Sequence, residues 1–266
     1  MIVLIMPIVR INDVELHYEK FGNGGAPIVF VHGFLASSKM WQDFYIPNLP
    51  ASYHAYAIDM RGHGQSHHIK HGCNVVQLAD DVFQFSQQLQ FEKFIYVGMS
   101  MGGATGIQLA LDHPNVLKAL ILMNPGFGST FSWGSRIMGS LFALIAQKPW
   151  FLKMLLKSML IRPPSENLIQ TFLNDGMLVS KETWAEYLHH TNRIQQLERL
   201  SHFEVPTLVM IGAKDHVLPL DMQHRLAAVI PNAKKIIFED EGHGMVEENP
   251  KAVFRAMMFF LEQHSL

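Results

Sequence analysis

The stretch YVGMSMGGA, residues 96–104, places one serine between two glycines where the hydropathy pattern changes. The residues before it, KFIYV, form a short apolar run typical of a buried strand, and the residues after it, MGGATGIQLAL, have the pattern of a helix. Gly98 and Gly102 flank Ser100, and glycine permits backbone angles and close approaches that other residues avoid. The stretch therefore predicts a sharp strand-to-helix turn with Ser100 at its tip.

Further apolar runs of strand length lie on both sides of this turn and alternate with helical patterns. They are APIVFVHGF, HAYAIDMRGHG, ALILMNP, TLVMIGAKD and KIIFEDEGHG, preceded by an expected hairpin around Asn12-Asp13. Helices are expected over residues 75–89, after Ser100 and at the end of the chain. Continuous apolar runs are typical of strands buried on both faces, and their alternation with helices predicts parallel pairing. The predicted fold class is α/β: a doubly wound, mostly parallel sheet with helices on both faces.

Residues 126–203 interrupt this alternation, because they contain no convincing strand. Their helical patterns break at Pro149 and at the later Pro-Pro pair, which predicts about four helices. A segment of this length is too long for a loop. We therefore expect a core domain in two parts, residues 1–125 and 204–266, with a helical lid at 126–203 inserted after the sixth strand.

Composition and charge narrow the classes of function. The chain has 266 residues, 48% of them hydrophobic, and a formal net charge of -2, which gives no reason to expect a nucleic acid as partner. It has no apolar run long enough to span a membrane, and its opening MIVLIMPIVR lacks the features of a signal peptide. Cys73 is the single cysteine, so no intrachain disulfide forms. We expect a soluble, cytoplasmic protein that starts at Met1 or Met6, and its oligomeric state stays open.

A serine hydroxyl becomes a nucleophile when a base takes its proton and a third group holds that base. His243 lies between two glycines in the loop after the last strand, and Asp215 ends the strand before it. In open parallel sheets, ligands bind at the carboxyl ends of the strands, where all three residues are expected. The predicted catalytic residues are therefore Ser100, Asp215 and His243.

Three other carboxylates compete with Asp215 for the role of orienting the base. Asp59 ends an earlier strand and is expected to cap the MRGHG turn that follows it. Asp240 and Glu241 stand too close to His243 in sequence to align its ring easily, although one of them can assist. Asp215 is the preferred partner.

The same chemistry requires N–H donors for the oxyanion that forms at the substrate carbonyl. Met101 begins the helix after the serine, and the free N–H groups of a helix N-terminus favour negative charge. The loop after IVFVHG supplies the second donor, which points to Phe34. The expected oxyanion hole is the backbone N–H groups of Phe34 and Met101.

These motifs resemble those of the α/β-hydrolase fold superfamily. The resemblance covers nearly the whole chain and rests on VHGF (31–34), DMRGHGQS (59–66), GMSMGG (98–103), GAKDHVLP (212–219) and GHGMVEENP (242–250). It implies a sheet of eight strands, a lid inserted after the sixth strand and a Ser-Asp-His triad.

Three positions separate the chain from particular branches of this superfamily. Ser100 distinguishes it from the dehalogenases and epoxide hydrolases of this fold, which carry aspartate there. Met99 stands where many relatives have histidine or asparagine. Met245 stands just after the GHG sequence, where relatives that cleave carbon–carbon bonds often carry tryptophan.

The predicted function is a serine hydrolase that cleaves small-molecule carboxylic esters or lactones through an acyl-enzyme on Ser100, without cofactor or metal. The apolar residues of the lid predict an apolar substrate pocket. The residues expected to line it are Phe34, Met99, Phe142, Trp150, Leu155, Val217 and Met245. A carbon–carbon hydrolase, a thioesterase or a cofactor-free perhydrolase would use the same triad. A slow-turnover small-molecule receptor is the alternative of another class.

Two other features have simpler interpretations. His67, His68 and His71 cluster in one loop, but no carboxylate or cysteine completes a metal-ligand set, so we expect a solvated loop and no metal. Lysines among the large apolar residues of the lid suit a membrane surface, but we favour a lid packed on the core and on the pocket, without stable membrane insertion.

Overall fold

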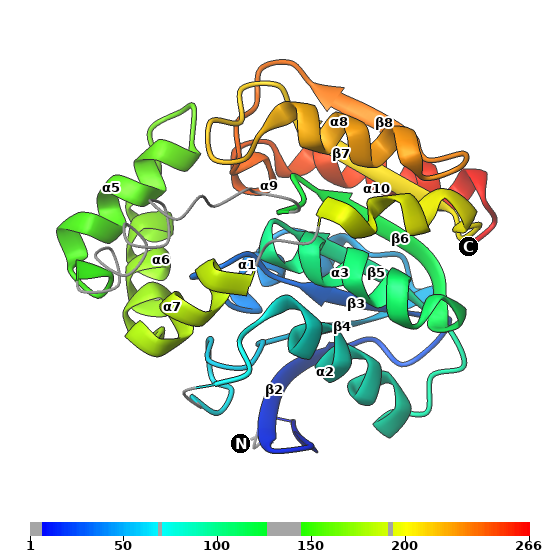
Figure 1. Ribbon diagram of the computed structural model, residues 1–266, viewed down its shortest axis with the longest axis horizontal. Coiled ribbons are helices and arrows are strands. Elements are labelled where there is room, and N and C mark those ends of the chain that lie inside the picture. The colour runs from blue at the N-terminus through cyan, green and yellow to red at the C-terminus, as the bar shows by residue number, and fades with distance from the viewer. Residues whose placement is uncertain (1–6, 69–70, 127–144, 191–193) are drawn as a thin grey trace.

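The computed structural model describes residues 7–68, 71–126, 145–190 and 194–266, which contain an eight-stranded sheet (Figure 1). The strands are β1 (Ile8–Ile11), β2 (Val14–Phe21), β3 (Ala26–Val31), β4 (Tyr53–Ile58), β5 (Phe94–Met99), β6 (Leu117–Met123), β7 (Thr207–Gly212) and β8 (Lys234–Phe238). Their order is β1-β2-β4-β3-β5-β6-β7-β8. The pairs β1–β2 and β2–β4 are antiparallel, whereas every later pair is parallel. The predicted hairpin and the mostly parallel α/β sheet are confirmed.

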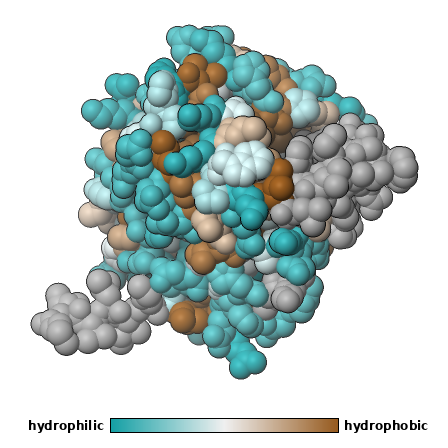
Figure 2. Space-filling view, turned by 90° about the vertical axis from the view of Figure 1, so that its left-hand side faces the viewer, coloured by the Kyte–Doolittle hydropathy of each residue, from teal (hydrophilic) through white to brown (hydrophobic). Residues whose placement is uncertain are grey.

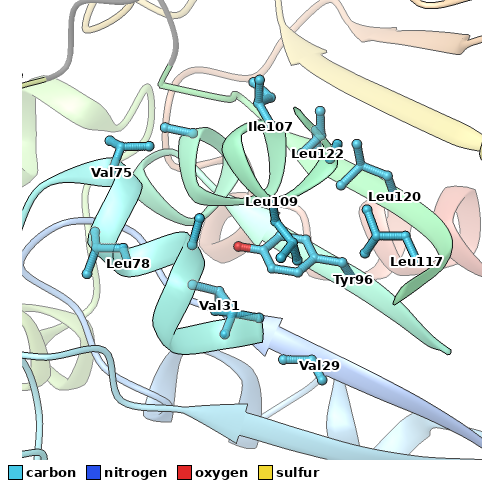
Figure 3. Close-up of a cluster of buried hydrophobic side chains, with 14 of the residues drawn as sticks. Val29, Val31, Val75, Leu78, Tyr96, Ile107, Leu109, Leu117, Leu120 and Leu122 are labelled. Atoms are coloured by element: carbon cyan, nitrogen blue, oxygen red, sulfur yellow. The ribbon is translucent and has the colours of Figure 1, made fainter. Parts of the chain in front are cut away.

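Helices cover both faces of the sheet because successive strand residues point to opposite faces. In β3, Val29 and Val31 face one apolar core, and Ile28 and Phe30 face the other. The first core is covered by α2 (Val75–Gln88), α3 (Met101–Asp112) and α8 (Leu220–Val229), and the second by α1 (Lys39–Gln42) and α10 (Pro250–Gln263). The remaining short helices here are η1 (Ile46–Asn48), η2 (Pro114–Val116) and α9 (Met245–Glu248). Figure 3 shows side chains of β3, β5 and β6 meeting those of α2 and α3.

Between β6 and β7 the structure describes helices and no strand, as the sequence predicts for these residues. They are α5 (Pro149–Met159), α6 (Glu166–Leu178), α7 (Lys181–His190) and η3 (Ile194–His202). Pro149 occupies the first turn of α5, where its missing N–H costs nothing, and the Ser165 side chain caps α6.

The helices of this insertion have a small apolar core of their own. It joins the inner faces of α5 and α6 to Trp184 of α7 and to Leu35 of the main domain. Leu197 and Leu200 of η3 pack instead into the core beneath the sheet. The last helix before β7 is therefore part of the sheet packing, and the domain boundaries at 126 and 203 stay predictions.

The outer face of the insertion carries exposed apolar side chains among polar ones. Trp150 is 60% exposed and Met154 is 51% exposed, and Lys153 and Lys157 are exposed on the same side of α5. Figure 2 shows the side of the molecule on which α5 and α6 lie, where hydrophobic side chains are scattered among hydrophilic ones. Within the described residues, no helix is both long and apolar enough to cross a bilayer.

Candidate active site

The turn at Ser100 is the tight elbow that its flanking glycines predict. Ser100 has a φ of 52° and a ψ of -109°, a backbone conformation that non-glycine residues rarely adopt. A β-carbon on Gly98 would collide with the carbonyl oxygen of Gly102, and one on Gly102 would collide with the carbonyl oxygen of Val31. Glycine is required at both positions because the strand, the turn and the following helix approach each other too closely for any side chain.

The structure brings the three predicted catalytic residues together at the carboxyl ends of the strands. The Nε2 atom of His243 lies 3.0 Å from the Oγ atom of Ser100. The Nδ1 atom of the same ring lies 2.8 Å from the Oδ2 atom of Asp215. The residues follow β5, β7 and β8, so the sheet order sets their spacing. In the tautomer with the proton on Nδ1, Ser100 donates to His243 and His243 donates to Asp215.

Asp215 is held as a carboxylate by four donors. Its Oδ1 atom accepts hydrogen bonds from the backbone N–H groups of Val217 and Leu218, at 2.8 and 3.0 Å. Its Oδ2 atom accepts from Gln223 as well as from His243. Burial by itself raises the pKa of Asp215, but the hydrogen bond and charge of His243 and the two N–H groups outweigh it, so the pKa lies below its ordinary value.

The competing carboxylates have other partners. Asp59 accepts hydrogen bonds from the backbone N–H groups of Ser38 and Gln65 and from His17, so it holds its own turn. Asp240 is exposed and pairs with Lys214. Glu241 is bonded by Arg162 and Asn249. Each of these carboxylates therefore has a structural role apart from the histidine ring.

The two expected oxyanion donors are backbone N–H groups. Among the described residues, the N–H groups of Phe34 and Met101 donate to no other group. Met101 is the first residue of α3, and both Phe34 and Ser100 line the same cavity. Both N–H groups are therefore available as donors to an oxygen bound beside Ser100. We keep them as the proposed oxyanion hole.

A cavity of about 480 Å³ opens over Ser100 and His243, between the sheet and the lid helices. This volume is typical of a pocket for a small molecule. Four of the residues expected to line it do so, and they are Phe34, Met99, Leu155 and Val217. Phe142 lies outside the described residues.

Two other residues expected in the pocket lie elsewhere. Trp150 is on the outer face of α5, five residues from Leu155 and therefore on another side of the helix. Met245 is fully buried in the core on the α10 face of the sheet, and its neighbours Val246 and Glu247 line the cavity instead. The sequence of α5 did indicate that Trp150 lies outside the pocket, since Trp150 and Met154 share a face of the helix with Lys153.

The cavity is also lined by ionisable side chains that were not predicted from the sequence. Asp175 of α6 is buried, accepts a hydrogen bond of 2.6 Å from Ser37 and pairs with Lys39 at 3.2 Å. Asp43 and Glu247 line the same cavity. Asp175 therefore joins the lid to the loop before α1 and to the first residue of α1, through residues more than 130 positions apart in the chain.

Asn124, at the end of β6, is a further residue that the sequence analysis missed. Its Nδ2 atom donates to the carbonyl oxygens of Gly242 and His243, both at 2.9 Å. Its Oδ1 atom accepts from the N–H group of Gly212 at 2.7 Å. Asn124 thus ties the histidine loop to the ends of β6 and β7 and holds the backbone of His243 in place.

We expect Asn124→Ala to lower the free energy of unfolding by about 2 to 3 kcal/mol, because it leaves three buried backbone groups without their partner. Chemical denaturation measures this change. Asn174→Ala, at an exposed position of α6, is the matched control and should stay within about 0.5 kcal/mol. Equal stabilities for the two variants would show that Asn124 does not hold the loop.

Comparisons with known proteins agree with this architecture. The family described as alpha/beta hydrolase fold matches residues 26–250. The chain is 30% identical over 253 residues to the AB hydrolase superfamily protein YisY of Bacillus subtilis (strain 168), covering 91% of this chain and 93% of that one. It is 27% identical over 276 residues to a 2-hydroxy-6-oxononadienedioate/2-hydroxy-6-oxononatrienedioate hydrolase of Cupriavidus pinatubonensis, covering 94% and 91%.

A similar fold occurs in the crystal structure of the enol-lactonase from Burkholderia xenovorans LB400. The TM-score is 0.86 at 23% sequence identity, and the match covers 96% of this chain and 100% of that one. The sheet order, the sharp turn at Ser100 and the family match over residues 26–250 lead to one assignment. This chain belongs to the alpha/beta hydrolase fold family.

Proposed function

We propose that this protein is a serine hydrolase that cleaves carboxylic esters or lactones through an acyl-enzyme on Ser100. The observation that supports this most directly is the continuous hydrogen-bonded series from Ser100 to His243 to Asp215, with distances of 3.0 and 2.8 Å. The series lies beside a cavity lined largely by apolar side chains. It can generate a nucleophile at neutral pH without any further group.

In the proposed acylation step, the Oγ atom of Ser100 attacks the substrate carbonyl while its proton moves to Nε2 of His243. The carbonyl oxygen becomes an oxyanion that accepts hydrogen bonds from the N–H groups of Phe34 and Met101. Asp215 stabilises the imidazolium that forms. The tetrahedral intermediate then collapses, and His243 returns its proton to the departing alcohol oxygen.

Deacylation repeats these steps with water as the nucleophile. His243 takes a proton from the water, the hydroxide oxygen attacks the acyl carbon, and the same N–H groups hold the oxyanion. The ester bond to Ser100 breaks, and His243 returns the proton to the serine oxygen. The products are a carboxylic acid and an alcohol, or a hydroxy acid where the substrate is a lactone.

The charges of the cavity favour uncharged substrates. Among the described lining residues, Asp43 and Asp175 are aspartates, and the one lysine, Lys39, is already paired with Asp175. The dienedioate in the name of the Cupriavidus relative carries two carboxylates, which this cavity would repel. We therefore place carbon–carbon cleavage of a dicarboxylate second to hydrolysis of an uncharged ester or lactone.

We expect kcat/KM for p-nitrophenyl esters to rise from acetyl to butyryl and hexanoyl. Each methylene that enters the apolar cavity contributes about 0.8 kcal/mol, or about fourfold, until the cavity is full. Leu155 lines the cavity, so Leu155→Ser should flatten the trend more than it reduces acetyl ester turnover. Steady-state kinetics over the acyl series, with lactones and thioesters alongside, measures this.

Trp150→Ser is the matched control, because Trp150 lies on the same helix but points away from the cavity. It should keep the wild-type trend. A specificity constant that falls steadily from acetyl onward would contradict the apolar pocket and favour short esters or lactones. Absence of turnover with every ester, lactone and thioester would favour the receptor alternative over the hydrolase.

A further inference from the structure

Glu247 is a carboxyl group in the wall of the cavity to which the proposed mechanism assigns no role. It lies in α9, four residues after His243. A β-carbon placed on Gly244 would be 3.5 Å from the Oε2 atom of Glu247 and would collide with Leu160 of the lid. The carboxyl group therefore lies over Gly244, the residue that follows the histidine, and beside the lid. All three residues line the cavity.

The Oε2 atom of Glu247 is buried and has no hydrogen-bond partner among the described residues. The hydroxyl of Tyr45 donates its proton to the carbonyl oxygen of Val246 at 3.2 Å, so that proton is not available to Glu247. A buried polar atom without a partner costs free energy that an apolar side chain at this position would not cost. A group that enters the cavity and bonds to this atom would remove that cost.

The carboxyl group is mostly protonated at neutral pH. Burial, with the negative charge of Glu248 adding to it, raises the pKa of Glu247 to about 8. A protonated carboxyl carries one O–H donor, which a carboxylate lacks. The partner that suits it is an oxygen acceptor in an uncharged molecule.

We infer that Glu247 determines specificity by donating a hydrogen bond to an oxygen atom of the substrate chain, apart from the carbonyl that Ser100 attacks. This inference rests on the proposed function, because the bound ester is a substrate only if the protein is a hydrolase. It narrows the class to esters or lactones that carry a second oxygen function, such as a hydroxyl, a ketone or an amide carbonyl. A purely aliphatic ester would leave the Glu247 donor unpaired.

A substrate cation is the main competing occupant, because Asp43 and Asp175 also line the cavity. A cation would bind the ionised form of Glu247 and would have to remove its proton first. Lys39 already balances Asp175. The uncharged oxygen acceptor is therefore preferred, and a cationic ligand forms one arm of the test.

The test measures binding in the Ser100→Ala background, where no ester is turned over. The probes are ethyl hexanoate and its hydroxy derivatives at each carbon from 2 to 6, and hexyl acetate with its corresponding hydroxy derivatives. Calorimetric titration gives the Kd of each derivative relative to its parent ester. At the chain position that reaches the carboxyl, Glu247→Leu should weaken this relative affinity by about tenfold to a hundredfold, because the hydroxyl then has no partner.

Glu247→Gln should retain most of the relative affinity, since its amide group still donates. Glu239→Gln, at an exposed glutamate, is the matched control and should leave the relative affinities as they are. Relative affinities that Glu247→Leu leaves unchanged at every position would overturn the inference. Tighter binding of ethyl 6-aminohexanoate than of any hydroxy ester would also overturn it, in favour of a cation site.

The pH dependence provides a test that needs no change at Glu247. For the keto ester at the matched chain position, whose carbonyl oxygen can only accept, the affinity relative to the parent ester should fall as the pH rises from about 6 to about 9.5, because the carboxylate cannot donate. It should stay level in Glu247→Gln. The other titratable groups near the cavity affect parent and derivative alike, and they are Lys39, Asp43, Tyr45, Asp175, His243 and Glu248. A level profile in the presence of Glu247 would contradict an uncharged donor.

These outcomes separate this inference from the proposed function. In one outcome, binding depends on the hydroxyl position and on Glu247, but the wild-type protein turns over no ester. That outcome would support the subsite and reject the hydrolase. Turnover of esters with no position dependence would do the reverse.

Discussion

Ser100→Ala reduces kcat for aryl ester hydrolysis by about 10⁶-fold, the expected result if Ser100 is the nucleophile of a triad that acts as a unit. The variant lacks the oxygen that forms the acyl-enzyme, while His243 and the oxyanion donors stay in place. Steady-state kinetics on a p-nitrophenyl ester measures the loss. A fluorophosphonate probe should label the wild-type protein once and the variant not at all.

The matched control is Ser201→Ala, an exposed serine of η3 whose hydroxyl bonds to the carbonyl oxygen of Glu198. It should retain both turnover and labelling. Circular dichroism should show that Ser100→Ala keeps the fold, because the substitution removes one oxygen at a position whose backbone is held by its neighbours. Labelling at another residue of the native protein would reject Ser100 as the nucleophile.

Asp215→Asn should reduce kcat by about 10⁴-fold. The asparagine amide can donate to Nδ1 of His243 where the carboxylate accepted from it, so the ring adopts the tautomer whose Nε2 carries a proton. That nitrogen then cannot take the proton of Ser100. The pairing that this change disrupts is the hydrogen bond of 2.8 Å between Asp215 and His243.

Asp240→Asn and Glu241→Gln test the competing carboxylates with the same type of substitution. Asp240 pairs with Lys214, and Glu241 pairs with Arg162, so both variants should keep turnover within about tenfold of wild type. An inactive Glu241→Gln beside an active Asp215→Asn would transfer the orienting role to Glu241.

The fold and the arrangement of the three candidate catalytic residues could be predicted because their signals are local. The two glycines around Ser100, each continuous apolar strand and each of the motifs that contain Ser100, Asp215 and His243 lie in short stretches of sequence. Parallel pairing then brings the ends of β5, β7 and β8 to one edge without further information. The amphipathic helix expected over residues 75–89 follows the same logic and is α2.

The lining of the cavity was predicted less well. Trp150 and Leu155 are both apolar and lie in one helix, yet Leu155 alone of the two faces the cavity. Hydropathy alone does not predict which face of a helix packs on the main domain, although the lysines beside Trp150 indicated an exposed face. Met245 was expected in the pocket from its place beside His243, but its side chain packs into the core and the next two residues face the cavity.

By itself, the sequence determined the α/β sheet, the sharp turn at Ser100 and the motifs that contain the candidate triad, because the signal for each strand, turn and motif lies in residues that are neighbours in the chain. The tertiary structure alone decided how Asn124 holds the histidine loop, how Asp175 joins the lid to Ser37 and Lys39, and where the Oε2 atom of Glu247 lies without a partner among the described residues. The first two features depend on contacts between positions as much as 138 residues apart, and the third depends on a hydrogen bond that the described residues do not supply. A polar residue has the same letter in the sequence whether folding gives it a partner or leaves it facing a cavity.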